Sequence, residues 1–256
     1  MSEAKLLILI AALLPPQSLN LLGAFVEERM VQTPYGDVGP LALRCLEDAS
    51  TEESVPDANV WVQPYAGLPT RTDPRATLYA AQKLGIEYVL NWDMGIAINP
   101  VLQPGQPLIV TDYIDWTRHQ PTTFTQESTA AEINMRSANY SRTPTAAQTP
   151  FCTRINTSLQ SLLPYAPNGI YLGIDGPRRA TAAEVRMYRQ WGADVVGYNL
   201  VPEVALAQEL GLRYAGLVTI GTRNNQLTNE LEEEAIRRSL GATLNVLPGL
   251  IRMLQC

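Results

Sequence analysis

The stretch Tyr171–Glu203, YLGIDGPRRATAAEVRMYRQWGADVVGYNLVPE, decides the fold class of this chain. It opens inside the apolar run 170–174, which is typical of a buried strand. A helix is predicted over 181–191, because its first residue is a threonine and Glu184 follows three residues later, the spacing of a capping box. A second strand is predicted over 194–198. A strand, a helix and a strand in succession indicate an α/β protein.

The same alternation of strands and helices extends to both sides of this stretch. Short apolar runs bounded by turn residues predict strands over 6–14, 41–46, 86–91, 108–112 and 214–219. Apolar residues at helical spacing predict helices over 74–84, 150–163, 201–210 and 230–255. The connections are predicted to be loops, including 15–20, 48–59 and 92–106. The polar segment 125–148 is expected to form an extended lid or loop with a partly helical middle. We therefore expect a single domain over 1–256, with a mixed, twisted central β-sheet flanked by helices on both faces.

Composition and charge exclude several classes of function. Apolar residues make up 46% of the 256 residues, which is enough for a sizeable core. The net charge of −6 argues against nucleic-acid binding, which needs clustered Lys and Arg. The three cysteines, Cys45, Cys152 and Cys256, are widely spaced, which is typical of reduced thiols and not of metal ligands. With His119 as the only histidine, a zinc site is not predicted either. We expect a cytoplasmic protein without a metal ion or resident cofactor.

The apolar run 6–14 allows two interpretations. A buried first strand is favoured over a signal sequence, because Glu3 precedes the run and Pro15 and Pro16 follow it where small residues would mark a cleavage site. The run is also too short to cross a bilayer as a helix. We therefore expect no membrane insertion.

Four segments carry a resemblance to a known family. They are RATLYAAQKLGIEYVL at 75–90, LQPGQPLIVTDYIDWTRHQPTTF at 102–124, the helix start PFC at 150–152, and the stretch 174–219 with its GPR, RQWGADVVG and VPE motifs in order. Together they resemble the nucleoside phosphorylase superfamily and, within it, the 5′-methylthioadenosine phosphorylase branch. The resemblance implies that fold, a homotrimer, and cleavage of the N-glycosidic bond of a purine nucleoside with phosphate as the second substrate.

The positions that the resemblance assigns to phosphate lack residues suited to a dianion. The first turn reads AALLPPQSLN over 11–20 and has no glycine, while 62–67, VQPYAG, has no basic residue. A small Thr/Ser-Ala pair of the family is replaced by Trp92 and Asp93, and the carboxylate would repel phosphate. Phosphate is therefore expected as a substrate only if phosphorolysis is retained.

The positions assigned to the nucleoside also differ from the family. Arg179 replaces an aromatic residue that contacts the purine, and Ile220 and Thr222 replace two acidic residues that read it. The ribose-facing Met-Thr-Thr run reads Tyr198-Asn199-Leu200. The substrate-pocket positions implied by the resemblance are Trp92, Met94, Arg179, Tyr198, Asn199, Leu200, Thr219, Ile220 and Thr222.

These replacements favour a non-catalytic relative, acting as a structural, interaction or ligand-sensing protein. The alternative is an active pentosyltransferase or nucleosidase, cleaving a nucleoside such as 5′-methylthioadenosine. In that case Asp93 is the candidate catalytic residue, with a carboxylate that activates water and with Glu203 and Asp175 as supports. Glu203 could instead cap the helix that follows it, and Asp175 could anchor the neighbouring turn.

Contacts with partner chains are inferred only from where segments of the sequence fall in the family that it resembles. The resemblance places 112–124 and the helix from residue 150 near the contacts of a trimer. His119 is there expected to be solvated or at an interface. The polar segment 125–148 could present a surface to another protein, and Trp92 could either fill the phosphate cavity or stack on a different ligand.

Overall fold

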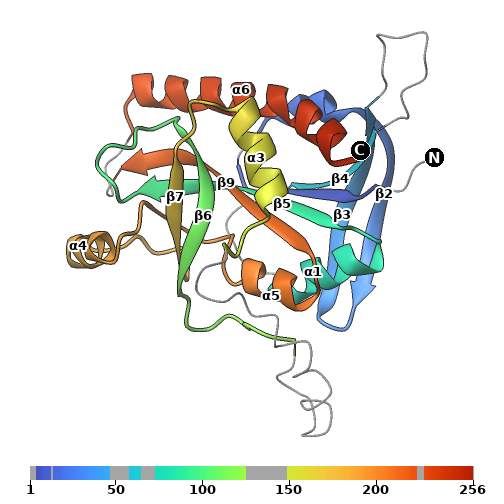
Figure 1. Ribbon diagram of the computed structural model, residues 1–256, viewed down its shortest axis with the longest axis horizontal. Helices are drawn as coiled ribbons and strands as arrows, with labels where there is room; N and C mark the ends of the chain where they lie inside the picture. The colour runs from blue at the N-terminus through green and yellow to red at the C-terminus, as the bar shows by residue number, and fades with distance from the viewer. Residues whose placement is uncertain are drawn as a thin grey trace, which may run out of the picture.

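The structure is a computed structural model that describes residues 4–12, 14–46, 58–64, 73–124, 149–223 and 228–255. Figure 1 shows the arrangement of its elements. The strands are β1 Leu6–Ile10, β2 Ala24–Thr33, β3 Gly36–Leu46, β4 Ala58–Pro64, β5 Tyr88–Ala97, β6 Pro107–Trp116, β7 Asn168–Ile174, β8 Val195–Gly197 and β9 Arg213–Arg223. The helices are the 3₁₀ helix η1 Pro16–Leu22 and the α-helices α1 Pro74–Lys83, α3 Thr153–Leu162, α4 Ala182–Gln190, α5 Glu203–Glu209 and α6 Glu230–Gln255.

All of these strands join one mixed sheet. The order is β2-β3-β4-β1-β5-β8-β7-β6-β9, and β5 also pairs with β9. The pairs β1–β4, β1–β5 and β5–β9 are parallel, whereas β2–β3, β3–β4, β5–β8 and β6–β9 are antiparallel. The predicted fold class, a mixed central sheet in an α/β protein, is confirmed.

Helices cover both faces of the sheet, as Figure 1 shows, with α3 and α6 on one side and α1 and α5 on the other. Every residue of β1 is buried, because a strand covered on both faces has no solvent side. Its odd-numbered residues Leu7 and Leu9 join a core cluster with α1 and α5. Its even-numbered residues Leu6 and Ile8 join a second cluster with α3 and α6. The apolar run thus begins with a buried strand, as predicted, but the strand ends at Ile10 and does not extend to residue 14.

One predicted boundary is wrong in a way that matters for the site. The segment 92–106 was expected to be a loop, but β5 continues as a strand to Ala97. The reason is tertiary: β9 pairs with β5 in parallel from Tyr88↔Arg213 to Ala97↔Arg223. The polar residues of β5 are therefore strand residues inside the sheet. The predicted lid over 125–148 and most of the predicted loop 48–59 lie outside the described residues.

The capping box predicted at the start of α4 is present. Thr181 accepts a hydrogen bond from the backbone N–H of Glu184, and the Glu184 carboxylate accepts one from the N–H of Thr181. Arg178 also pairs with this carboxylate. These hydrogen bonds lower the pKa of Glu184 to about 2, that from Arg178 being the largest contribution. The α4 start is therefore fixed by residues within six positions of one another in the sequence.

Candidate functional site

A buried carboxylate lies where β5, β7 and the segment after β8 meet. Asp93 on β5 is 1% exposed. Its Oδ2 accepts a hydrogen bond from the Tyr171 hydroxyl at 2.7 Å, and its Oδ1 accepts bonds from the Asn199 side-chain amide and from the Met94 N–H, each at 2.7 Å. Both oxygens are thus held by donors from this chain, as a buried charge requires.

A second layer of hydrogen bonds extends from Asn199. Its N–H donates to the Tyr171 hydroxyl oxygen at 3.1 Å, and its carbonyl accepts from the Asn91 side chain at 2.7 Å. The same Asn91 amide donates to the Tyr214 hydroxyl at 2.9 Å. Side-chain and backbone groups of Asn199 are therefore fixed from β5 and β7 at once.

The charges in this cluster follow from its burial. Burial raises the pKa of Asp93, and the hydrogen bonds from Tyr171, Asn199 and Met94 oppose that rise. Burial and the adjacent Asp93 carboxylate raise the pKa of Tyr171 well above its ordinary value. Tyr171 therefore stays a hydroxyl donor at neutral pH, and the cluster can hold a backbone segment in place.

Trp92 lies on the opposite face of the sheet from Asp93, since successive strand residues alternate. Its indole is fully buried among the side chains that face α3 and α6, and Nε1 donates to the Thr219 hydroxyl at 3.0 Å. Met94 packs on the same side, and a Cβ added at Gly221 would lie 3.0 Å from its methyl group. The nine pocket positions implied by the resemblance are therefore divided between two faces.

Three of the remaining positions lie around the ends of β7 and β8. Tyr198 is half-buried, and its hydroxyl donates to the Arg178 carbonyl at 3.3 Å. Burial raises the pKa of Tyr198, while nearby Arg179, which is exposed, acts to lower it. Asn199 follows Tyr198 and belongs to the Asp93 cluster. The structure thus brings Asp93, Tyr198, Asn199 and Arg179 into one neighbourhood.

The other three positions are Leu200, Ile220 and Thr222, and Thr222 is partly buried. Leu200 and Ile220 are fully buried core residues. The Thr222 hydroxyl oxygen is buried and has no hydrogen-bond partner among the described residues. A buried polar atom of this kind is a place where a ligand or water is expected to bind.

Neither proposed support, Glu203 or Asp175, is among the residues whose hydrogen bonds to Asp93 are described above. Glu203 is in the first turn of α5, where a carboxylate suits the helix N-terminus. Asp175 accepts from the Arg118 N–H at 2.9 Å, so it anchors the turn after β7. His119 is exposed. Over the described ranges, no cluster of three His, Cys, Asp or Glu side chains could hold a metal ion, and no helix is long and apolar enough to cross a membrane.

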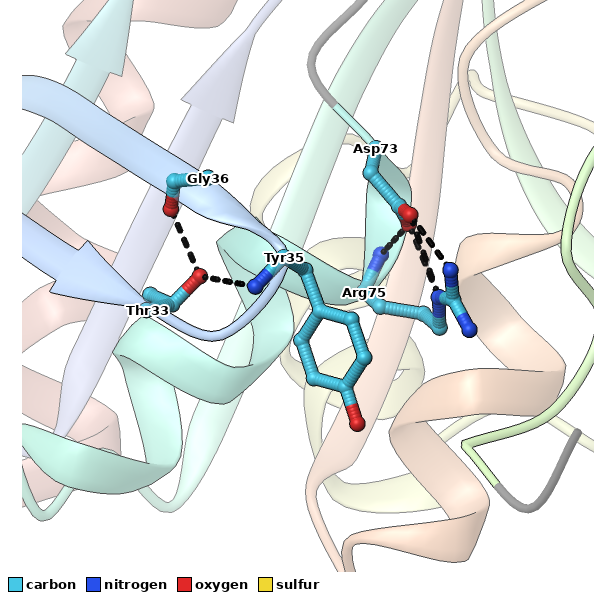
Figure 2. Close-up of polar contacts among 5 residues, drawn as sticks. All are labelled: Thr33, Tyr35, Gly36, Asp73 and Arg75. Carbon is cyan, nitrogen blue, oxygen red and sulfur yellow. Dashed lines mark hydrogen bonds and ion pairs between the residues drawn. The ribbon is translucent and has the colours of Figure 1, made fainter. Parts of the chain in front are cut away.

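A separate cluster joins the β2–β3 hairpin to the start of α1, shown in Figure 2. Thr33 closes the turn by donating to the Gly36 carbonyl at 2.6 Å. The turn residue Tyr35 lies under the Arg75 guanidinium, 4.6 Å from ring centre to carbon. Arg75 also pairs with Asp73, the residue that caps α1. The positive charge of Arg75 is thus balanced by its neighbour in the helix start.

Tyr171, Asn91 and Tyr214 were missed as parts of the site when the sequence was considered alone. Each is a polar residue inside an otherwise apolar strand, in VLNWD, IYLGI or RYAGL. A polar residue inside an apolar strand indicates a buried hydrogen-bonding group, because a buried polar side chain needs a partner. It does not say which partner, since the three residues are far apart in the sequence.

Comparison with known proteins places this architecture in a family. Residues 58–252 match the profile of the phosphorylase superfamily. The chain belongs to the phosphorylase superfamily. Its described strands β4 to β9, and so the Asp93 cluster, all lie inside the matched region.

Among superfamily members, the chain is similar to purine-nucleoside enzymes of archaea. It is 31% identical over 205 residues to 6-oxopurine nucleoside phosphorylase of Pyrococcus furiosus, covering 75% of this chain and 71% of that protein. It is 36% identical over 151 residues to S-methyl-5′-thioadenosine phosphorylase of the same organism, covering 57% of this chain and 54% of that protein. The match thus spans about half the length of the latter relative.

Solved structures of the superfamily share the fold. Methylthioadenosine phosphorylase from Schistosoma mansoni in complex with adenine superposes with a TM-score of 0.76 at 22% identity, over 98% of this chain and 92% of that one. A variant of the same enzyme in complex with methylthioadenosine gives 0.77 at 21% identity. At these identities the likeness establishes the fold.

The expectation of a non-catalytic relative is wrong. The two Pyrococcus furiosus relatives, which match 75% and 57% of this chain, are both phosphorylases. This similarity gives no support to the interpretation of the chain as a non-catalytic relative. That expectation counted every replaced position as a lost ligand contact. However, Trp92, Leu200 and Ile220 are fully buried in this protein, so these replacements reflect packing of the core.

Proposed function

We propose that this protein is a pentosyltransferase that cleaves the N-glycosidic bond of a purine nucleoside with phosphate. The observation that carries the proposal is its 31% identity over 205 residues to a 6-oxopurine nucleoside phosphorylase. Similarity to S-methyl-5′-thioadenosine phosphorylase makes 5′-methylthioadenosine a second substrate to test. Phosphate is a substrate in this reaction, and no resident cofactor is required.

The reaction needs groups that bind the purine as it leaves, because a purine anion is a poor leaving group. Thr222 stands at a purine-reading position by resemblance, and its hydroxyl has no partner among the described residues. We assign it a hydrogen bond to the base. Tyr198 and Asn199 occupy the ribose-facing positions and line the same neighbourhood as Arg179.

The test is release of free base from 5′-methylthioadenosine, adenosine and inosine, with and without phosphate. Phosphorolysis yields a pentose 1-phosphate, and hydrolysis yields the free pentose, so product analysis separates the two reactions. We expect phosphate-dependent release. Absence of release from all three nucleosides, with or without phosphate, would refute the proposal.

Two valine substitutions test the role of Thr222. Thr222→Val keeps the shape of the side chain and removes the hydroxyl, so KM for the nucleoside should rise about fivefold. Thr243→Val is the matched control, because the Thr243 hydroxyl in α6 is also buried without a partner among the described residues. Equal kinetics of the two variants would remove Thr222 from the base site.

We also propose that the chain assembles as a homo-oligomer, and specifically a trimer, as the family resemblance implies. Exposed apolar side chains support an association surface, among them Trp116 at 36% and Trp191 at 40% exposure, whose rings are 4.9 Å apart. A mass measurement in solution tests this, and a monomer at micromolar concentration would contradict it.

A further inference from the structure

We propose that Asp93 is a positioning residue, whose carboxylate together with Tyr171 fixes the segment 198–200 beside the nucleoside. The inference rests on the proposed function for the identity of the ligand. It assigns Asp93 a role other than direct attack or activation of water. Three features of the Asp93 cluster, which consists of Asp93, Tyr171, Asn199 and Asn91, support this role.

The first feature is the engagement of the carboxylate. Asp93 is 1% exposed, and three donors from this chain, Tyr171, Asn199 and the Met94 N–H, bind its two oxygens at 2.7 Å. A group that activates water must reach that water within hydrogen-bonding distance. The geometry instead satisfies the carboxylate with protein donors, which is how a buried charge is used to hold structure.

The second feature is that the hydrogen bonds converge on one residue. Asn199 donates its side-chain amide to Asp93 and its N–H to the Tyr171 hydroxyl, which itself donates to Asp93. Asn91 donates to the Asn199 carbonyl. The segment has no regular secondary structure, so these side chains replace the sheet ladder that ends with β8.

The third feature is the close packing around the cluster. A Cβ at Gly197 would collide with the Tyr171 hydroxyl and lie 2.7 Å from Asp93 Oδ2. Leu200, on the far side of Asn199, is fully buried, and a Cβ at Gly216 would collide with it. Tyr198 therefore lies between two fixed residues, the closely packed Gly197 and the hydrogen-bonded Asn199, and its ring lies against Gly176. Such support determines how accurately Tyr198 and Asn199 meet a ligand.

The experiment compares Asp93→Asn, Asp93→Leu and Tyr171→Phe by nucleoside kinetics. Asparagine keeps an oxygen for the Met94 and Asn199 donors, so Asp93→Asn should retain kcat within about tenfold. Leucine has a similar size and accepts no hydrogen bond, so Asp93→Leu should raise KM and lower kcat by about tenfold or more. Loss of turnover in Asp93→Asn equal to that in Asp93→Leu would indicate a direct chemical role and overturn the proposal.

A second measurement does not depend on turnover. Hydrogen exchange of the Asn199 backbone N–H should accelerate about tenfold in both variants. Tyr171→Phe removes its acceptor, the Tyr171 hydroxyl, and Asp93→Leu displaces that hydroxyl by removing its own acceptor. Tyr188→Phe is the matched control, since Tyr188 is fully buried and its hydroxyl has no partner among the described residues. Unchanged exchange in both test variants would overturn the positioning role even if no nucleoside is cleaved. Failure of the proposed function alone would leave the accelerated exchange in place.

Discussion

The substitution Gly197→Ala tests how tightly the Asp93 cluster is packed. Gly197 ends β8, and an added Cβ would collide with the Tyr171 hydroxyl, besides lying 2.7 Å from Asp93 Oδ2 and 2.8 Å from Tyr171 Cε2. These atoms belong to buried side chains in fixed hydrogen bonds, so they cannot rotate away. The ring of Tyr171 must shift, and its bond to Asp93 must lengthen or break.

The cost can be estimated from its two parts. Overpacking a core by one methyl group costs about 1–3 kcal/mol. Losing a hydrogen bond to a charged group costs about 1.5–3 kcal/mol. We therefore expect Gly197→Ala to reduce the free energy of unfolding by about 3–5 kcal/mol. For a protein of this size, that loss corresponds to a melting temperature lower by about 10 °C.

Urea and thermal unfolding measure this effect, with Gly241→Ala as the matched control. Apart from its chain neighbours and the backbone of its own helical turn, a Cβ at Gly241 in α6 would meet no atom within 4 Å, so the same change should stabilise the helix by about 1 kcal/mol. The double variant Gly197→Ala/Tyr171→Phe should lose less stability than the sum of the two single variants, because phenylalanine lacks the oxygen that the Cβ meets. Gly197→Ala within about 1 kcal/mol of the wild type would refute the packing argument.

Three further predictions concern pKa values and one buried hydrogen bond. Burial raises the pKa of Asp93 above its ordinary 3.8, so the Asp93 contribution to stability is greatest below pH 3.8 and is lost as pH rises through the folded pKa. The stability difference should therefore move in favour of Asp93→Asn as pH rises from about 4 to about 8 in urea unfolding. The pKa of Glu184 is about 2, against an ordinary 4.5, so its stabilising effect is lost as pH falls through that range. Arg178→Gln should raise this pKa, as an NMR titration would show. Thr219→Val should reduce the free energy of unfolding by about 1–3 kcal/mol, measured by thermal unfolding, because the indole N–H of Trp92 loses its acceptor.

Local sequence patterns predicted most elements correctly because their causes lie within a few residues. The α4 start is an example: Thr181 and Glu184 bind each other's backbone N–H, so the capping box can be recognised in the sequence. The helix predicted over 74–84 is α1, which has Pro74 at its start and Asp73 as its cap. The family resemblance, carried by motifs of the same kind, is also confirmed.

The end of β5 could not be predicted in this way. Residues from Trp92 to Ala97 include an aspartate and a glycine, which are depleted in strands, and they pair with β9 more than 100 residues later. The aspartate and the glycine hide the strand from a local reading of the sequence, although the other four residues of 92–97 are apolar. Its strand conformation is a property of the sheet.

By itself, the sequence determined the α/β class, the order of most strands and helices, and the family of this protein, because periodicity, caps and motifs are local. The tertiary structure alone decided which polar residues meet. It buried Asp93 beside Tyr171 and Asn199, 78 and 106 residues away in the chain, and it turned Trp92 to the opposite face. A buried charge is stable only with its partners in place, and those partners are brought together by the folding of the sheet.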